Sequence, residues 1–204
     1  MNALRSRIRD GGHRITDIAF FGTSGYVLVE DQYTPRYENL PEAAKNALQE
    51  IVNKGMRIRR IVTNPSFTSS WLVLYGDNEW MNSSGLPPSL LDSLTAFHNW
   101  NRPIRDVTLL PEEGWLIIEE NDSVVEVNGD LFKRRILDSG QHVSRLVVKD
   151  RGTWFFLRPP NGGTPNGIGD DLSAVLTAVR TPHTQIVTFA FTPAGGWILL
   201  TDHN

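Results

Sequence analysis

The sequence predicts a mainly β protein with short helices, in which five similar units close into a ring and an N-terminal helix completes the last unit. Three observations predict this fold class. An aromatic residue recurs at intervals of 39 to 45 residues, each time at the same place in a pattern of strands. A segment with helical spacing follows four of the five strand patterns. The fifth pattern has no such segment after it, and a short helical segment stands at residues 2–9 instead.

Each unit opens with two short strands joined by a tight turn. The first strand has apolar residues at its first and fourth positions, and the second begins with an aromatic residue followed by apolar ones. Gly or Pro lies between the strands, and Asp or Asn follows the second strand, as expected of hairpins. The aromatic residues that open the second strands are Tyr26, Trp71, Trp115, Trp154 and Trp197.

A weaker third strand and one amphipathic helix complete the predicted unit. Third strands are expected at residues 79–82 and 124–127. The Gly-rich segment 162–167 is expected to be a flexible loop that replaces the third strand of unit four, and residues 33–37 depart from the repeat in a comparable way. Apolar residues three or four positions apart predict helices at 40–52, 87–98, 130–137 and 170–179.

These units form a single predicted domain, in which the N-terminal segment closes the ring. The unit boundaries are about 13–55, 56–101, 102–141, 142–183, and 184–204 together with 1–12. Leu4 and Ile8 give segment 2–9 an apolar face, and this segment runs into the first strand as the other helices run into theirs. An open array of repeats would need polar caps at both ends, and neither terminal segment resembles one.

The strand pairs resemble the first two strands of tryptophan-aspartate-repeat β-propeller blades. Residues 184–204 show the order of those blades, with an apolar strand that leads to Phe, a Thr-Pro-x-Gly turn, a second apolar strand and an Asp turn. Gly12-His13 is similar to the pair that precedes them. The resemblance implies a propeller-like architecture and no particular function. The chain departs from the family because the tryptophan-aspartate pair is absent and a helix stands where the outer strand should be.

Composition narrows the classes of function. The 204 residues include 20 Lys and Arg against 23 Asp and Glu, and this net charge of -3 argues against a nucleic-acid partner. No apolar stretch is long enough to span a membrane and no signal sequence is evident, so we expect no membrane partner and a cytoplasmic location. The absence of Cys excludes disulfides and cysteine nucleophiles. No cofactor and no metal is predicted.

The third position of the first strands gives the main candidate site. If the first strands line a central channel, the five residues at this position converge there: Asp17, Arg60, Asp106, Arg145 and Thr188. Alternating Asp and Arg would form charge-assisted hydrogen bonds. These bonds either plug the channel or, with Arg59 and Arg105 nearby, bind a small polar or anionic ligand. We favour the plug, because buried charges must be paired and this alternation pairs them without a ligand.

Histidines form a second candidate group. His13, His98, His142 and His183 fall in connections between a helix and the next strand, on one rim of the predicted ring. Such clustering suggests a metal site or a general base. However, equivalent points on adjacent units are far apart, and no His-x-x-x-His or His-x-Glu pair is present. We therefore favour a role in capping turns, in which each His bonds the Asp of a neighbouring hairpin.

The tryptophans divide into two groups. The aromatic residues that recur once per unit suit either sugar binding or packing between units, and packing is favoured because one large residue recurs at one structural position. Trp80 and Trp100 lie outside that position and flank one predicted helix. They are therefore candidates for a site specific to unit two, with packing of the helix as the favoured alternative.

The leading functional hypothesis is a non-catalytic binding or interaction module. It would use the channel mouth or the histidine rim for a small polar molecule or a protein partner. The alternative is a small-molecule enzyme of cyclase or hydrolase type, with Asp17 or Asp106 and a rim His in acid-base roles and Arg60 or Arg145 stabilising an anion. An open pocket that contains Asp and His favours the enzyme, whereas a channel closed by Asp-Arg pairs argues against it.

Overall fold

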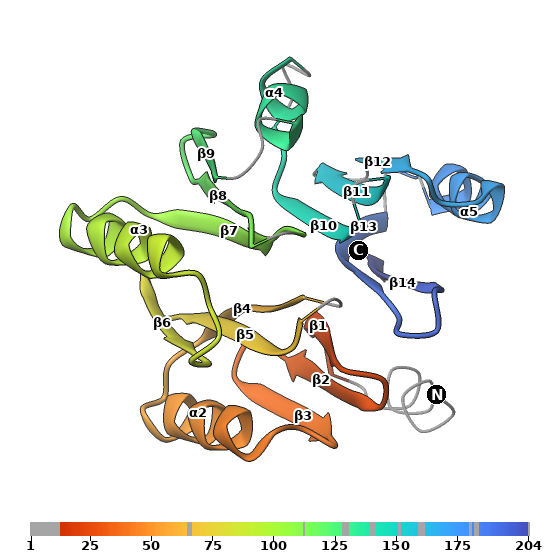
Figure 1. The fold of residues 1–204 in the computed structure, drawn as a ribbon. Helices are drawn as coiled ribbons and strands as arrows, with labels where there is room; N and C mark the ends of the chain where they lie inside the picture. The colour runs from red at the N-terminus through yellow and green to blue at the C-terminus, as the bar shows by residue number, and fades with distance from the viewer. Residues whose placement is uncertain are drawn as a thin grey trace.

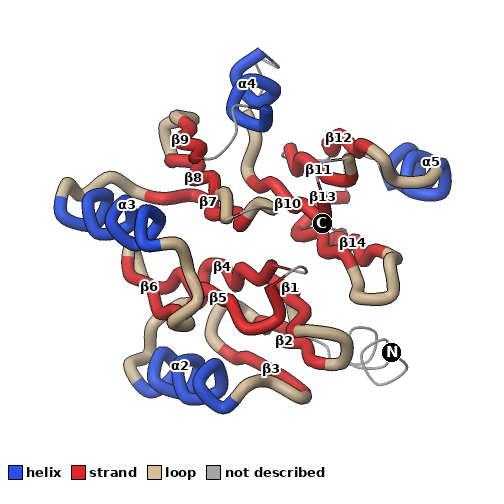
Figure 2. Tube along the Cα trace, viewed as in Figure 1, coloured by secondary structure: helices blue, strands red, loops and turns tan. Residues whose placement is uncertain are grey.

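The computed structural model describes residues 13–64, 67–111, 113–127, 131–138, 142–150, 152–158, 162–179, 181 and 184–203. The predicted helix at 2–9 and the candidate His183 lie outside these residues. The described chain is mainly β with four short helices (Figures 1 and 2). No helix in this part of the chain is long and apolar enough to cross a membrane.

The strands form five small antiparallel sheets (Figure 1). Four sheets have three strands each: β1 (Ile15–Phe21), β2 (Gly25–Glu30) and β3 (Thr34–Glu38); β4 (Ile58–Asn64), β5 (Phe67–Tyr75) and β6 (Glu79–Asn82); β7 (Ile104–Leu109), β8 (Trp115–Glu119) and β9 (Val124–Val127); β10 (Arg145–Asp150), β11 (Thr153–Arg158) and β12 (Gly162–Asn166). The fifth sheet pairs β13 (Thr184–Phe191) with β14 (Trp197–His203). Backbone-to-backbone pairing of strands stays within each sheet, so the sheets are not closed into a barrel.

The helices follow the third strands, close to where their apolar spacing predicts them. They are α2 (Glu42–Asn53), α3 (Pro88–Asn99), α4 (Leu131–Asp138) and α5 (Asp170–Val179). The positive φ angles of Asp31 and Gln32, 52° and 68°, confirm a tight turn after β2, because such turns need residues that tolerate the left-handed region. The repeated plan of hairpin, third strand and helix is therefore present in four units.

Two expectations about the third strands were wrong. Segment 162–167 is not a loop in place of a third strand, and segment 33–37 does not depart from the repeat. They largely form β3 and β12, and β12 pairs with β11 along its whole length. The glycine content of β12 has a packing reason, since a Cβ on Gly163 would collide with the ring of Phe155. Glycines that are typical of a loop here allow a strand to approach an aromatic ring closely.

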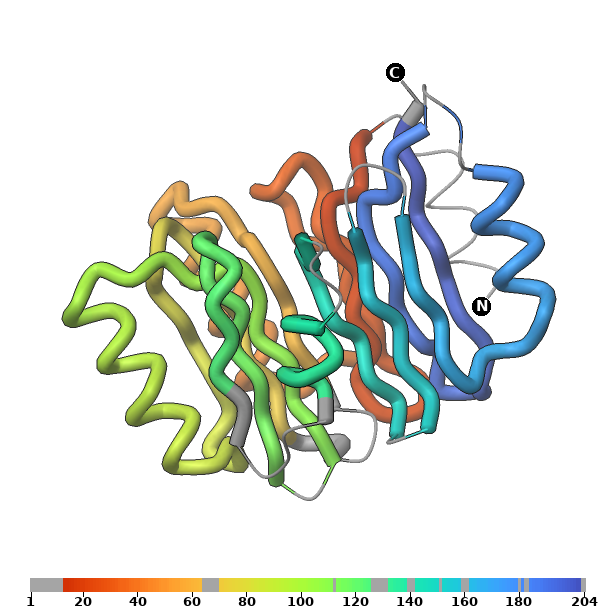
Figure 3. Tube along the Cα trace, turned by 90° about the horizontal axis from the view of Figure 1, so that it is seen from above, coloured from red at the N-terminus to blue at the C-terminus, as the bar shows by residue number. Residues whose placement is uncertain are grey.

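The first strands of all five sheets lie together at the centre of the molecule, and the helices lie outside them (Figure 1). β1 contacts β4 and β13, β7 contacts β4 and β10, and β10 also contacts β13. Viewed from above, the sheets stand side by side, with α3 and α5 on opposite flanks (Figure 3). Residues from distant parts of the chain therefore meet at the first strands.

The hydrophobic core is divided into five clusters, each of which lies in a seam between two sheets. The first four seams each receive one helix, for example α2 through Leu48 and Ile51. The fifth, between β13–β14 and β1–β2, contains no helix among the described residues. The first four aromatic residues of the repeat are between 1% and 6% exposed, and Trp197 is partly buried, which confirms the packing interpretation.

Candidate functional site

A repeated irregularity in the first strands positions the candidate residues. The register between first and second strands shifts just before the candidate position in four units: between Ile15 and Asp17, Ile58 and Arg60, Ile104 and Asp106, and Ile186 and Thr188. Such a β-bulge bends the strand and redirects the next side chain. In unit four, Arg145 pairs with Leu157 at the equivalent place.

The structure brings the five candidate side chains into one hydrogen-bonded layer. Oδ1 of Asp17 accepts from Nη1 of Arg60 at 3.0 Å and from Nη1 of Arg145 at 2.8 Å. The Thr188 hydroxyl donates to the same oxygen at 3.3 Å and accepts from Arg145. Nε of Arg60 donates to Oδ1 of Asp106 at 2.9 Å. We call this set of five residues the central charged layer.

Each carboxylate of the central charged layer also holds the backbone of another first strand. Oδ2 of Asp17 accepts from the N–H of Ile61 at 2.7 Å, and Oδ2 of Asp106 accepts from the N–H of Leu146 at 3.0 Å. Each first strand is an edge strand of its sheet, whose outer backbone groups need partners. The carboxylates supply these partners and join one sheet to the next.

The two carboxyls of the layer respond differently to burial, although each residue is only 1% exposed. Burial raises the pKa of Asp17, but Arg145, Arg60 and the N–H of Ile61 outweigh it and hold that pKa below its ordinary value. At Asp106 burial outweighs the attraction of Arg60, so the pKa is raised. Burial also lowers the pKa of Arg145, whereas two carboxylates raise that of Arg60.

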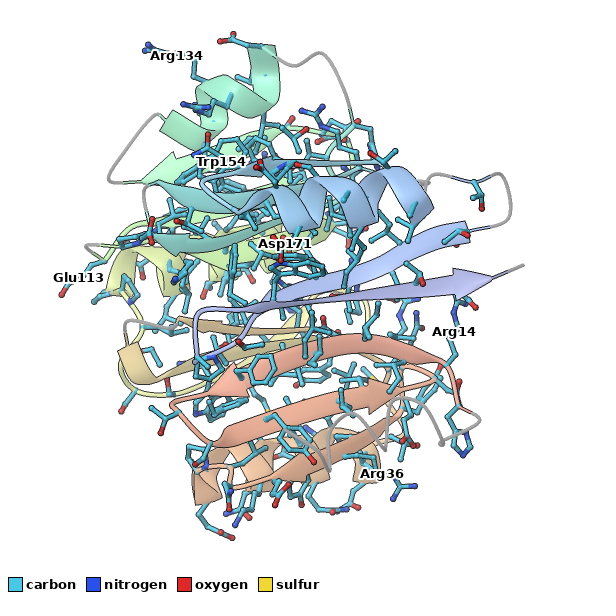
Figure 4. The ribbon with its side chains drawn as sticks, turned by 90° about the vertical axis from the view of Figure 1, so that its right-hand side faces the viewer. Arg14, Arg36, Glu113, Arg134, Trp154 and Asp171 are labelled. Carbon is cyan, nitrogen blue, oxygen red and sulfur yellow. The ribbon has the colours of Figure 1, made fainter. Side chains whose placement is uncertain are left out.

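A cavity of about 430 Å³ adjoins the central charged layer. It is lined by all five first strands, with Ile18, Phe20 and Val62 among the apolar residues and Thr63 among the polar ones. The turns after β1 and β13 form part of its edge. It therefore lies toward the end of the molecule that carries Glu113, opposite the end that carries Arg14 (Figure 4). The sequence did not predict which end would be hollow.

Two cations line this cavity without being fully paired. The hydrogen bonds of Arg60 use Nε and Nη1, and no described residue accepts from Nη2. Lys149, at the far end of β10, has no ion-pair or hydrogen-bond partner among the described residues. Sequence reasoning missed Lys149, although it lies on the same first strand as Arg145, four residues further on.

Arg59 and Arg105 are engaged with neighbouring units rather than with the cavity. Arg59 Nη2 donates to the carbonyl of Ile104 at 2.6 Å, and Arg105 Nη1 donates to the carbonyl of Val143 at 3.4 Å. Ile104 is the first residue of β7, and Val143 lies two residues before β10. Arg59 also pairs with Glu120 at 3.1 Å. These arginines bridge two seams, so the structure does not place them as ligand-binding partners of the central layer.

His13 and His142 bond to turn residues. Nδ1 of His13 lies 3.2 Å from Oδ2 of Asp31, and Nδ1 of His142 lies 2.7 Å from Oδ1 of Asp122. Both acids lie in the turn after a second strand, as the turn-capping interpretation predicts. The two histidines precede the first strands, whereas the later residues of those strands line the cavity. No described histidine belongs to the cavity lining.

The two tryptophans of unit two lie in different environments. The ring of Trp80 meets the edge of His98, with centroids 5.9 Å apart, and packs against the core of the seam between units two and three. Trp100 follows α3 and is 68% exposed. Packing therefore accounts for Trp80, while Trp100 stands at the surface away from the central charged layer.

Neither a metal-ligand group nor a similarity to known proteins assigns a function to the site. In the described part of the chain, no group of three His, Asp or Glu side chains could hold a metal ion. No protein-family model matches the sequence, and no curated protein matches it. Function is therefore inferred from the geometry of the site.

Proposed function

We propose that the chain is a closed five-unit, propeller-like ring that acts as a non-catalytic binding module, with a small polar or anionic molecule held in the central cavity. One observation carries the proposal: the cavity ends at a buried arginine that still has donors to offer. Arg60 is 6% exposed, lines the cavity, and has no acceptor for Nη2 among the described residues. Cavities of roughly 300–1,000 Å³ are the usual size for small-molecule sites.

Two features support closure of the ring. Hydrogen bonds of the central charged layer and its backbone partners link β1 to β4, β4 to β7, β7 to β10, β10 to β13 and β13 to β1. The fifth seam has no helix among the described residues, although each other seam has one. We propose that residues 1–12, with Leu4 and Ile8 on one face, cover it. Arg14, which follows this segment in the chain, contacts β14, since its Nε lies 2.8 Å from Oδ2 of Asp202.

The central cavity suits a ligand better than the histidine rim does. His13 and His142 are already bonded within the chain. A second cavity, of about 450 Å³, lies between units two and three, and its lining includes Leu86, Pro87 and Gly114. The central cavity alone, of these two, is lined by residues from every unit. The side chains that line it differ from unit to unit, and the cations among them are Arg60 of unit two and Lys149 of unit four.

The enzyme alternative finds less support in this geometry. A general base must reach the proton that it abstracts. Asp17 is 1% exposed and is held by Arg60 and Arg145, which keep its carboxylate ionised and occupied. The described histidines are not in the cavity lining. The central charged layer is therefore a floor for the cavity, and we assign it no acid-base step.

Blocking the cavity tests the proposed function. Binding of a panel of small carboxylates and phosphates is measured by thermal shift and by calorimetry. Thr63→Trp places a large ring at the cavity wall and should weaken binding by about tenfold or more, because the lost contact exceeds 1.4 kcal/mol. Ser173→Trp on the exposed face of α5 is the matched control and should bind as the parent does. Equal binding by both variants would place the ligand elsewhere.

A further inference from the structure

We propose that the ligand of the central cavity is an elongated small molecule with an anionic group at each end, of which a linear dicarboxylate is the simplest form. This inference rests on the proposed function and names its ligand class. It uses two cations at different depths of one cavity, Arg60 at the floor and Lys149 at the mouth.

The floor of the cavity offers a fixed hydrogen-bond donor. Two carboxylates hold the guanidinium of Arg60 through Nε and Nη1, so its orientation is set before a ligand arrives. Nη2 has no acceptor among the described residues. A guanidinium held in this way is preorganised to donate to a carboxylate oxygen. Because the central charged layer contains two acids and two arginines, its net charge is zero and a ligand anion meets no excess negative charge.

The mouth of the cavity offers a second, adjustable cation. The Nζ of Lys149 stands 3.8 Å from the place that a Cβ on Gly195 would occupy, beside the turn between β13 and β14. Asp150 is the acid next to it in the lining, and Oδ1 of Asp150 accepts from the N–H of Gly152 at 2.9 Å. No described carboxylate pairs with Lys149. A ligand anion at the mouth would give this unpaired cation an ion-pair partner.

The strand that carries Lys149 gives the scale of the separation between the two cations along the cavity. Arg145 and Lys149 lie four residues apart on β10, which corresponds to about 13 Å in a regular strand. The register with β11 shifts between Val148 and Asp150, so about 13 Å is the upper end of their separation along the strand. Arg145 and Arg60 donate to the same oxygen of Asp17, so Arg60 lies at the depth of Arg145. Allowing ~3 Å for each hydrogen bond leaves roughly 7 Å between the two anionic groups of the ligand.

The walls between the two cations suit the middle of such a ligand. Ile18, Phe20 and Val62 are apolar, and Thr63 adds a hydroxyl. A methylene chain would displace water from the apolar part of this wall, which is favourable in proportion to the area covered. A ligand with a charged middle would leave that charge unpaired against these residues. An anionic group at both ends and an apolar chain between them is therefore the complementary arrangement.

Calorimetry with a chain-length series tests the two-anchor ligand. Linear dicarboxylates from malonate to sebacate are compared with monocarboxylates of equal length, on the full chain and on Lys149→Met and Lys149→Arg. We expect tightest binding near adipate or pimelate, and about tenfold tighter binding than hexanoate or heptanoate, as one added charge-assisted hydrogen bond provides. Lys149→Met should abolish that preference, and Lys149→Arg should keep it.

The outcomes separate this inference from the proposed function. If monocarboxylates bind as tightly as dicarboxylates to the parent chain, and Thr63→Trp weakens both, the two-anchor ligand is wrong and the cavity remains the site. The same conclusion follows if Lys149→Met keeps the preference for dicarboxylates. If no carboxylate or phosphate in either panel binds the parent chain, both proposals are overturned.

Discussion

The centre and the periphery of this molecule contain the same kinds of charged residue and use them differently. At the centre, Arg60 is 6% exposed and joins two carboxylates that belong to different units. At the periphery, the side chains of Arg57 and Asp77 are 45% and 98% exposed and lie within one unit. The contribution of a charged contact to stability therefore depends more on its burial, and on whether it links separate units, than on residue type.

The apolar contacts show a related contrast. Each seam is filled by the faces of two sheets, and four seams gain Leu or Ile from a helix at the outside, such as Leu172 and Leu176 of α5. The central charged layer has no such helix and depends on hydrogen bonds between side chains. The centre should consequently be sensitive to single polar substitutions, and the periphery to loss of apolar cover.

The largest effect is expected from Arg60→Ala. The substitution leaves Asp17 and Asp106 buried without a shared cation, and breaking a buried ion pair in this way costs about 3–5 kcal/mol. The free energy of unfolding, measured by urea denaturation with circular dichroism, should fall by that amount. A loss below about 1 kcal/mol would show that water replaces the guanidinium and that the layer is not a structural plug.

Arg57→Ala is the matched control at the periphery. It removes the same side chain three positions earlier, at a site where the partner carboxylate is 98% exposed. Exposed ion pairs contribute about 0–1 kcal/mol, so the free energy of unfolding should change little. Similar losses for Arg57→Ala and Arg60→Ala would remove the distinction between centre and periphery.

The second effect concerns apolar cover at the fifth seam. If residues 1–12 cover that seam, deletion of residues 1–11 removes Leu4 and Ile8 and uncovers the apolar side chains of the seam. The deletion should cost about 3 kcal/mol, since a buried aliphatic side chain contributes about 1.5–3 kcal/mol. Leu4→Asp in the full chain should produce part of that loss. Unchanged melting of both variants, with an unchanged oligomeric state by light scattering, would contradict closure by the N-terminal segment.

The parts of this structure that repeat were predictable from the sequence. Trp71, Trp115 and Trp154 mark equivalent strands because a large apolar residue must fill each seam. The convergence of Asp17, Arg60 and Asp106 also followed from the repeat, since the same strand position in each unit meets the same neighbour.

The parts that were missed depend on a single neighbour rather than on the repeat. Gly163 is small because Phe155 approaches it, which no local pattern encodes. Lys149 became a candidate only once the strand that carries it was seen to line a cavity. Arg59 and Arg105 were placed near the site, yet their hydrogen bonds reach the next unit's backbone. Contacts between units are set by tertiary packing, so one chain's local sequence does not determine them.

The third prediction compares the two carboxyls within the centre. At pH 7, Asp17→Asn should cost more than Asp106→Asn, because the folded protein favours the ionised form of Asp17 and disfavours that of Asp106. Asp17 has two arginine partners, and its pKa is lowered, whereas Asp106 has one and its pKa is raised. Urea denaturation of both variants gives the comparison. Equal costs at pH 7 would show that the two carboxyls are equivalent.

The stability costs of the same two substitutions should change in opposite directions as the pH changes. The stability that Asp17 contributes is present above the unfolded pKa of about 4 and is lost as the pH falls through its lower folded pKa, so the cost of Asp17→Asn shrinks in acid. Asp106 binds its proton more tightly when folded, so its contribution falls as the pH rises from about 4 through its folded pKa. The cost of Asp106→Asn should therefore shrink as the pH rises, and parallel pH profiles would contradict both assignments.

The smallest effect is expected at the histidine rim. The side chains of His142 and Asp122 are 46% and 54% exposed, and Arg105 also bonds Asp122, so His142→Ala leaves that carboxylate paired. The free energy of unfolding should fall by less than about 1 kcal/mol, and less in high salt, because exposed pairs are screened. His13→Ala should behave alike. Calorimetry with the best dicarboxylate should give an unchanged Kd for both variants, since neither histidine lines the cavity. A higher Kd in either variant would show that the histidine rim contributes to the binding site.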